Sequence, residues 1–195
     1  MTPHTVWFIR HGETQWNSAG RLQGRSDSPL TLRGREQAAR NGDTLLQAVP
    51  DFQNLHFVSS PLGRTRTTME IMRERIGLPA HGYETDHRLA EMGFGDWEGL
   101  TWPHIRIHRN EEWMTREQTK WTHAARGGES FRDVAERLRD WFASIEHDLV
   151  VVSHGAVGRV LRGLYHRMSE QDIPDLPNLE QDCIYRFAKG SEATL

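Results

Sequence analysis

Two histidines in this sequence stand just after short apolar runs, and each is followed by glycine. His11 follows the run at residues 6–9, and His154 follows the run at residues 149–152. Glycine lacks a Cβ and lets a ligand approach the backbone closely. An imidazole can serve as a nucleophile, an acid or a hydrogen-bond donor near neutral pH. The two His-Gly pairs therefore predict a reactive site at the ends of two strands.

Two arginines occupy matching positions in the sequence. Arg10 directly precedes His11, and Arg64 follows a third apolar run at residues 55–59. A guanidinium group presents a planar fork of hydrogen-bond donors that matches the oxygens of a phosphate. We therefore expect the two arginines and the two histidines to bind a phosphoryl group.

The surrounding pattern predicts the elements that bring these residues together. Apolar runs of strand length alternate with segments of helical periodicity. The predicted helices are residues 31–49, 64–76, 130–146 and 157–164, and the predicted strands are residues 6–9, 55–59, 149–152 and 183–187, the last followed by a polar tail. Ser130 and Asp133 have the spacing of a capping box. Such alternation indicates an α/β fold with parallel strands, in which ligands bind beyond the carboxyl ends of the strands.

The segment at residues 93–128 interrupts this alternation. It contains four of the seven tryptophans, mixes them with charged residues and ends in two glycines. We interpret it as a cap-like insertion that covers the site, within a single domain spanning residues 1–195. The candidates for the walls of a substrate pocket in this insertion are Trp102, His104, Trp113 and Met114.

Composition narrows the class of protein. A net charge of -3 argues against non-specific nucleic-acid binding, which needs a basic excess. No apolar run approaches the roughly 20 residues of a membrane span, and residues 1–9 do not resemble a secretory leader. Cys183 is the only cysteine, which excludes an intrachain disulfide and a cysteine-based zinc site. We expect a cytoplasmic protein that binds neither nucleic acid nor membrane.

Five groups of residues, in order along the chain, resemble the signature of the histidine phosphatase superfamily, also called the phosphoglycerate-mutase-like family. They are Arg10-His11-Gly12 with Thr14 and Asn17, residues 21–24, residues 60–64, Leu89-Ala90-Glu91 with residues 95–99, and Ser153-His154-Gly155. The resemblance covers nearly the whole chain. It implies a mostly parallel central sheet with helices on both faces and an insertion covering the active site.

The resemblance also implies catalytic roles. His11 would attack phosphorus and carry the phosphoryl group as a phosphohistidine. Arg10, Arg64 and His154 would hold the non-bridging oxygens and offset charge in the transition state. Glu91 would protonate the leaving oxygen and then activate the water that hydrolyses the intermediate.

The remaining members of the signature would bind substrate. Asn17, Gln23, Gly24 and Gly155 would position the phosphate or the substrate. No metal and no cofactor is implied, because arginines and a second histidine supply the positive surroundings of the phosphate. The implied partner is a small-molecule phosphate ester, and the chain is expected to be a monomer or a homodimer.

Several alternatives stay open at this point. Glu98 competes with Glu91 as the acid, Arg64 has the alternative of a solvated helix arginine, and Asn17 that of a turn residue. His104 and His108 have the spacing of metal ligands on a helix, but without a third ligand they are expected to face solvent.

The residues after Glu91 and the short chain favour the phosphatase branch of the family, with metal-independent phosphoric monoester hydrolysis as the activity. The enzymatic alternatives are a phosphoglycerate mutase and a specialised sugar or ribazole phosphate phosphatase. The non-enzymatic alternative is a phospho-ligand binding protein.

Overall fold

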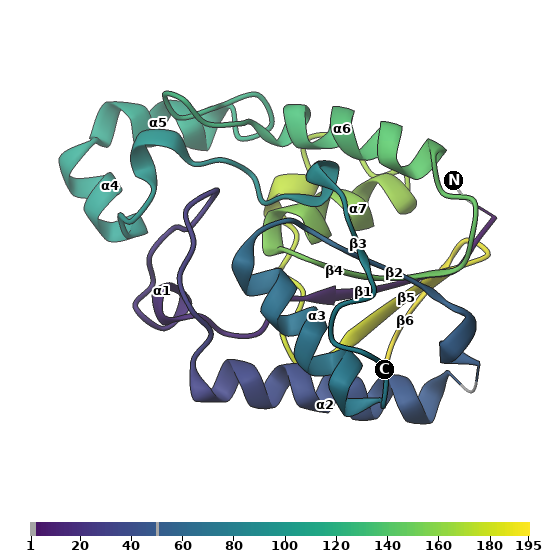
Figure 1. Cartoon of the computed structure of the whole chain (residues 1–195). Coiled ribbons are helices and arrows are strands. Elements are labelled where there is room, and N and C mark those ends of the chain that lie inside the picture. Colours follow the sequence, from purple (N-terminus) through teal and green to yellow (C-terminus); the bar gives the residue numbers. More distant parts are fainter. Residues whose placement is uncertain (1–2, 50) are drawn as a thin grey trace.

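A six-stranded sheet with the strand order β3-β2-β4-β1-β5-β6 forms the centre of the computed structural model, which describes residues 3–49 and 51–195 (Figure 1). Its strands are β1 (Val6–Arg10), β2 (His56–Ser59), β3 (Glu84–Thr85), β4 (Leu149–Ser153), β5 (Ile184–Ala188) and β6 (Ser191–Thr194). Strands β1 to β4 pair in parallel, whereas β5 and β6 pair antiparallel. The predicted α/β fold with a mostly parallel sheet is confirmed.

Helices cover both faces of the sheet, because successive side chains of a strand point to opposite sides. Trp7 and Ile9 of β1 pack in the core with α2 (Leu32–Ala48) and α3 (Gly63–Arg75). Val6 and Phe8 pack in the other core, with α6 (Phe131–Ala143) and α7 (Gly155–Tyr165). Figure 1 shows the two pairs of helices on opposite sides of the sheet. Within the described part of the chain, no helix has the length and apolar character to cross a membrane.

The short elements connect this framework. They are α1 (Gln15–Ser18) and the 3₁₀ helices η1 (Phe52–Asn54), η2 (His87–Leu89), η3 (Gly95–Trp97) and η4 (Ile173–Asp175). Thr14 caps α1, and the predicted capping box of Ser130 and Asp133 is present at the start of α6. Strand β4 is buried along its whole length, so the chain segment that leads to His154 is held on both sides.

Three expectations from the sequence need correction. The polar tail forms the edge strand β6, whose mostly exposed side chains lack the apolar alternation that predicts a strand. Strand β5 pairs antiparallel with β1, because only η4 and irregular chain lie between α7 and β5, with no crossover helix. The helix predicted for residues 130–146 ends at Ala143, although Ile145 still packs against the core.

The insertion at residues 93–128, called the cap below, carries η3, α4 (Trp102–His108) and α5 (Asn110–Gln118). In Figure 1 these two helices lie beyond the carboxyl ends of the strands, to the left of the sheet. A small apolar core of Trp97, Ile105 and Ala125 holds the cap together. The two ends of the cap meet where Glu129 N donates to Gly93 O at 2.8 Å.

Candidate active site

The carboxyl ends of β1, β2 and β4 bring three of the predicted residues together. The ring centroids of His11 and His154 lie 5.2 Å apart. Arg64 Nε, from the first turn of α3, lies 3.3 Å from His11 Nε2. All three residues are at most 2% exposed. Three segments that are far apart in the sequence thus meet at the edge of the sheet where the sequence predicts them.

The two ring nitrogens of His11 have different partners, and together they define its tautomer. His11 Nδ1 lies 2.8 Å from Gly12 O, and a carbonyl oxygen only accepts. In the neutral ring Nδ1 therefore carries the proton. His11 Nε2 then accepts from Arg64 Nε–H, which only donates. The lone pair of Nε2 faces the positively charged side of the site.

The surroundings of His11 keep its imidazole neutral. Burial lowers the pKa of His11 well below its usual value of 6.5, and the guanidinium groups of Arg64 and Arg10 lower it further. The sequence predicts the effect of the arginines, and the structure adds burial as the larger cause. At neutral pH the ring is therefore unprotonated at Nε2, as a nucleophile must be.

Arg64 is buried and connects His11 to the loop after α1. Its guanidinium donates to Gly24 O at 2.8 Å, to Ser26 O at 2.8 Å and to Asp27 Oδ1 at 3.0 Å. The alternative of a solvated arginine is therefore wrong. The guanidinium group has five N–H donors, and four protein atoms, including His11 Nε2, accept from it. Arg64 therefore holds the loop and His11 in place and also supplies positive charge.

His154 and Arg10 present polar atoms without a protein partner among the described residues. His154 Nε2 lies 2.7 Å from Ser60 Oγ, while its Nδ1 is buried and unpaired. Arg10 donates to Leu179 O at 3.0 Å, while its Nε is buried and unpaired. Burial lowers the pKa of His154 well below its usual value, with Arg64 as the next cause. Buried polar atoms normally have partners, so these two nitrogens indicate a ligand site.

Glu91 lies at the entrance to the cap and is 9% exposed. Its Oε1 accepts from Met92 N at 2.9 Å, and its Oε2 accepts from Ala156 N at 3.4 Å, in the first turn of α7. It interacts electrostatically with Arg10. The structure thus places Glu91 beside the arginine that precedes His11.

Glu98, the competing carboxylate, has a different environment. Its two oxygens accept from Arg25 N at 2.8 Å, Ser26 N at 2.9 Å, Ser26 Oγ at 2.5 Å and Phe94 N at 3.2 Å. A carboxylate with four donors in place is already fully used as an acceptor. Glu98 therefore fixes the loop that holds Arg64, whereas the oxygens of Glu91 accept from two backbone N–H groups alone.

The predicted substrate-binding residues lie around this centre. Gln23 is buried, and its Oε1 accepts from Ser28 Oγ at 3.1 Å. Gly24 has a φ of +55°, and a Cβ there would lie 2.2 Å from Glu98 Oε1. A Cβ on Gly155 would lie 3.5 Å from the unpaired Arg10 Nε. A Cβ would therefore clash with the Glu98 carboxylate at Gly24, and at Gly155 it would come within 2.9 Å of Asn178 Oδ1.

Asn17 has the turn role that the sequence leaves open, and it also contacts a residue behind His11. Its backbone N–H donates to Thr14 Oγ1 and its Oδ1 accepts from Thr14 N, both at 3.1 Å, so it forms the capping box of α1. Asn17 Oδ1 also accepts from Gln181 Nε2 at 3.2 Å. Two donors on Oδ1 orient the amide, and its Nδ2 points away from them.

Gln181 is a site residue that the sequence does not reveal. Besides Asn17, its Nε2 donates to His11 O at 3.0 Å, and its own backbone oxygen accepts from Asn41 Nδ2 at 3.0 Å. The segment before β5 therefore braces both the nucleophile and the amide beside it. It carries no motif and no periodicity, so the only available signal is its position before a strand next to β1.

The cap candidates fall into two groups. Trp102 and Trp113 are half-buried and pack together, with ring centroids 5.7 Å apart. His104 and Met114 are exposed. His104 and His108 lie with ring centroids 4.5 Å apart, and among residues 3–49 and 51–195 no group of three or more His, Cys, Asp or Glu is arranged to hold a metal.

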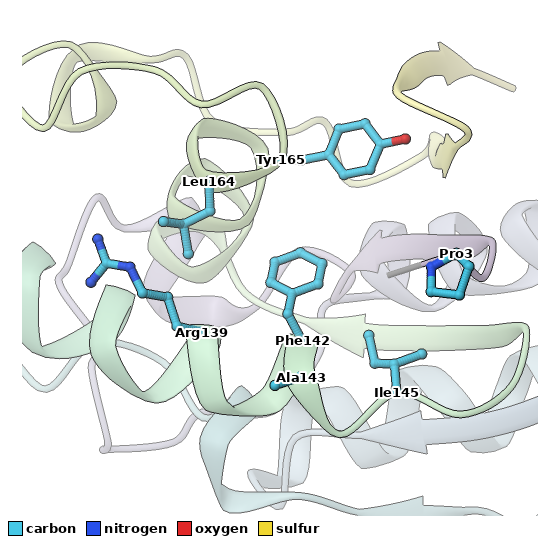
Figure 2. A pocket seen from close by; sticks show the side chains of 7 residues that line it. All are labelled: Pro3, Arg139, Phe142, Ala143, Ile145, Leu164 and Tyr165. Atoms are coloured by element: carbon cyan, nitrogen blue, oxygen red, sulfur yellow. The ribbon is translucent and has the colours of Figure 1, made fainter. Parts of the chain in front are cut away.

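A separate cavity of about 390 Å³ opens between α6 and α7, near the start of β1 (Figure 2). It is lined by Pro3, Arg139, Phe142, Ala143, Ile145, Leu164 and Tyr165. None of the predicted site residues lines it. It lies at the amino end of β1, whereas His11 follows the carboxyl end.

Comparison with known sequences identifies a family. The sequence pattern of the Histidine phosphatase superfamily (branch 1) matches residues 6–191. A relative in Salmonella paratyphi C, "Probable phosphoglycerate mutase GpmB", is 36% identical over 141 residues, which are 71% of this chain and 61% of that protein. The chain therefore spans about three fifths of the length of this relative.

Solved structures match over almost the whole chain. Mycobacterial glucosyl-3-phosphoglycerate phosphatase in complex with VO3 has a TM-score of 0.80 and 29% identity, and the match covers 94% of this chain and 90% of that one. That phosphatase has also been solved with inorganic phosphate. The α-ribazole phosphatase of Shigella flexneri has a TM-score of 0.80 and 27% identity, with coverage of 96% and 93%.

Proposed function

We propose that this chain, which belongs to branch 1 of the histidine phosphatase superfamily, hydrolyses small phosphate monoesters through a phosphohistidine at His11, without a metal. The observation that carries the proposal is the state of His11. Its ring is neutral, and Nε2 holds a lone pair beside Arg64 Nε at 3.3 Å. The positive charges that keep the imidazole unprotonated also attract an anionic phosphate, so this environment suits attack of Nε2 on phosphorus.

In the first step His11 Nε2 attacks phosphorus in line with the ester oxygen. The N–P bond forms, the P–O bond breaks, and the proton of a neutral Glu91 passes to the leaving oxygen. Arg10, Arg64 and His154 donate to the non-bridging oxygens. Because the lone pair of Nε2 is used in the new bond, Arg64 Nε–H is released from His11 and turns to a phosphoryl oxygen.

In the second step water replaces the histidine. The carboxylate of Glu91 takes a proton from the water as its oxygen bonds to phosphorus, and the N–P bond breaks with its electron pair returning to Nε2. Inorganic phosphate leaves, Glu91 is again protonated, and His11 is again neutral. Asn17, Gln23, Gly24 and Gly155 position the phosphate during both steps.

The cap supplies the surface that meets the leaving group, within a single domain. Two named phosphatases share the fold along more than nine tenths of the chain, which supports hydrolysis as the principal reaction. A second candidate is phosphoglycerate mutase, favoured by the relative with 36% identity. In a mutase the phosphohistidine passes its phosphoryl group to a sugar acid instead of to water.

Hydrolysis of 4-nitrophenyl phosphate in the presence of a chelator tests the proposal. We expect turnover by the wild-type protein, and alkaline quench after a labelled donor should trap label on His11. The variant His11→Ala should trap no label, whereas His108→Ala, on the exposed face of α4, serves as the control and should behave as wild type. Undiminished turnover by His11→Ala would remove His11 from the mechanism. Bisphosphate-primed interconversion of phosphoglycerates faster than phosphate release would identify the mutase.

A further inference from the structure

Arg159 lies next to the proposed acid but has no part in the mechanism above. It stands on α7 three residues beyond Ala156, whose N–H donates to Glu91 Oε2. Residues three apart share a helix face, and side chains lean toward the amino end of their helix. Arg159 accordingly interacts electrostatically with Glu91 and with Arg10.

The guanidinium of Arg159 is largely enclosed and forms no ion pair with a carboxylate of the described residues. One of its terminal nitrogens donates to Pro174 O at 2.8 Å, and the group lies 4.9 Å above the ring of Phe131. Its Nε is buried and unpaired, and no carboxylate of the described residues lies within 4.0 Å of it. Burial lowers the pKa of Arg159 to about 10. Buried charges are normally paired, so we expect Arg159 to pair with an anion that the chain itself does not supply.

A second arginine approaches from the cap. The guanidinium of Arg116 lies 4.6 Å above the ring of Trp102, and its side chain is 14% exposed. Lys120, one turn further along, donates to Asp175 at 2.6 Å and so ties the end of α5 to η4, where Arg159 is anchored. Arg116 and Arg159 interact with each other electrostatically.

The carboxylates near Arg116 and Arg159 do not fully neutralise the positive charge of this region. Glu117 pairs with Arg116 at 2.6 Å and with Lys120 at 3.6 Å, and Asp175 pairs with Lys120. Glu91 is neutral when it acts as the acid in the proposed mechanism. While substrate binds and before the proton of Glu91 is transferred, the carboxylate that still acts on Arg159 is Asp175, which is already paired with Lys120.

We propose that Arg159 and Arg116 form a second anion site beside Glu91, so that the preferred substrates are phosphate monoesters whose leaving group carries its own carboxylate or phosphoryl group. This inference rests on the proposed function and specifies its substrate class. Guanidinium groups suit both anions because each presents paired oxygens. The position next to Glu91 places that anion on the leaving-group side of the phosphoryl site.

A series of two-carbon esters that differ mainly in charge tests the inference. The members are phosphoglycolate, ethane-1,2-diol bisphosphate, 2-hydroxyethyl phosphate and phosphoethanolamine, with 4-nitrophenyl phosphate as the general substrate. We expect kcat/KM for an anionic leaving group to exceed that for the neutral hydroxyethyl ester by at least about tenfold, as one charge-assisted hydrogen bond allows. A larger kcat/KM for phosphoglycolate would identify a carboxylate as the preferred anion, and a larger kcat/KM for the bisphosphate would identify a phosphoryl group.

Variants assign that preference to the arginines. Arg159→Met and Arg116→Met should each lower the ratio of anionic to neutral kcat/KM by several-fold. Arg139→Met is the matched control, because Arg139 is 49% exposed at the cavity of Figure 2, and it should keep the wild-type ratio. If Arg159→Met does not fold, Arg116→Met, which lies in the cap, still tests the pair.

The outcomes separate this inference from the proposed function. Turnover of 4-nitrophenyl phosphate with equal kcat/KM for anionic and neutral esters overturns the anion site and leaves the phosphatase standing. A preference that both methionine variants retain also overturns it. If no ester in the series is hydrolysed, the proposed function fails and the anion site fails with it.

Discussion

The two ends of the site differ in how firmly their side chains are held. At the phosphoryl end His11, Arg64 and His154 are at most 2% exposed, and each is hydrogen-bonded to a neighbour. The cap rests on a small core of its own, and its surface includes Ile107 at 71% and Met114 at 51% exposure. Burial and hydrogen bonding are therefore concentrated where the proposed chemistry is the same for every substrate.

The two ends have different tasks, namely stabilising charge on the phosphoryl group and recognising the leaving group. Stabilising charge on a phosphoryl group requires donors that are already in position, because reorienting them during the reaction costs free energy. Recognising a leaving group depends on shape and charge that differ between substrates. We therefore expect substitutions at the phosphoryl end to act on all substrates, and substitutions in the cap to act on some.

The largest effect is expected for His11→Asn. Loss of the nucleophile should lower kcat at least about 10⁴-fold for every ester, because it removes the atom that bonds to phosphorus in the proposed mechanism. Steady-state assays with an aryl and an alkyl phosphate measure it, and His108→Asn is the exposed control. A loss confined to one class of ester would break the proposed division between the two ends.

Glu91→Gln should give the next largest effect, and one that depends on the leaving group. For an alkyl phosphate kcat should fall about 10² to 10⁴-fold, because the alcohol needs a proton as it leaves. For 4-nitrophenyl phosphate the first step should be less affected, since nitrophenolate leaves without a proton. Glu98→Gln should instead act equally on both esters, through the loop that holds Arg64. Identical behaviour of the two variants would contradict the assignment of the acid.

Gln181→Glu tests whether the hydrogen bonds from Gln181 to His11 and Asn17 position the site. A carboxylate cannot donate to His11 O or to Asn17 Oδ1, so inhibition by inorganic phosphate should weaken by about tenfold. Gln181→Met removes the donor without adding charge and should weaken it less. Gln171→Met, on an exposed turn of the same connecting segment, is the control. Equal inhibition constants in all four proteins would show that Gln181 does not position the site.

Trp113→Ala should have a smaller effect that varies with substrate. The half-buried ring packs on Trp102, so its loss should change kcat/KM by a few-fold for bulky leaving groups and little for small ones. Met114→Ala, at the exposed neighbouring position, should match wild type within error. An equal loss of kcat/KM for all esters would instead indicate that Trp113 supports the phosphoryl end of the site.

The last prediction concerns stability rather than turnover. The pKa values of His11 and His154 are lowered in the folded state, so below about pH 6.5 the unfolded chain binds protons that the folded chain does not. The free energy of unfolding should therefore decrease as the pH falls from about 7 into this range. Urea unfolding at several pH values measures the slope, and His154→Asn should make it shallower. An unchanged slope in that variant would contradict the lowered pKa.

Much of the fold and the centre of the site were predictable from the sequence. Strands β1, β2 and β4 are apolar runs, and the residues that follow them must share one edge of a parallel sheet. That argument alone places His11, Arg64 and His154 together. The strands β5 and β6 were less predictable, because their pairing depends on neighbours far away in sequence rather than on local periodicity.

Residue types and apolar periodicity are local properties, so the sequence alone shows which chemical groups are present and which strand ends carry them. The hydrogen-bond partners and the burial of those groups follow from the folded chain. Packing fixed the tautomer of His11 through Gly12 O and Arg64, used both oxygens of Glu98 as acceptors, and placed Gln181 behind His11 and Arg159 near Glu91. These contacts form only when distant segments pack, and burial and charge, which set the pKa of a group, do not exist before that packing.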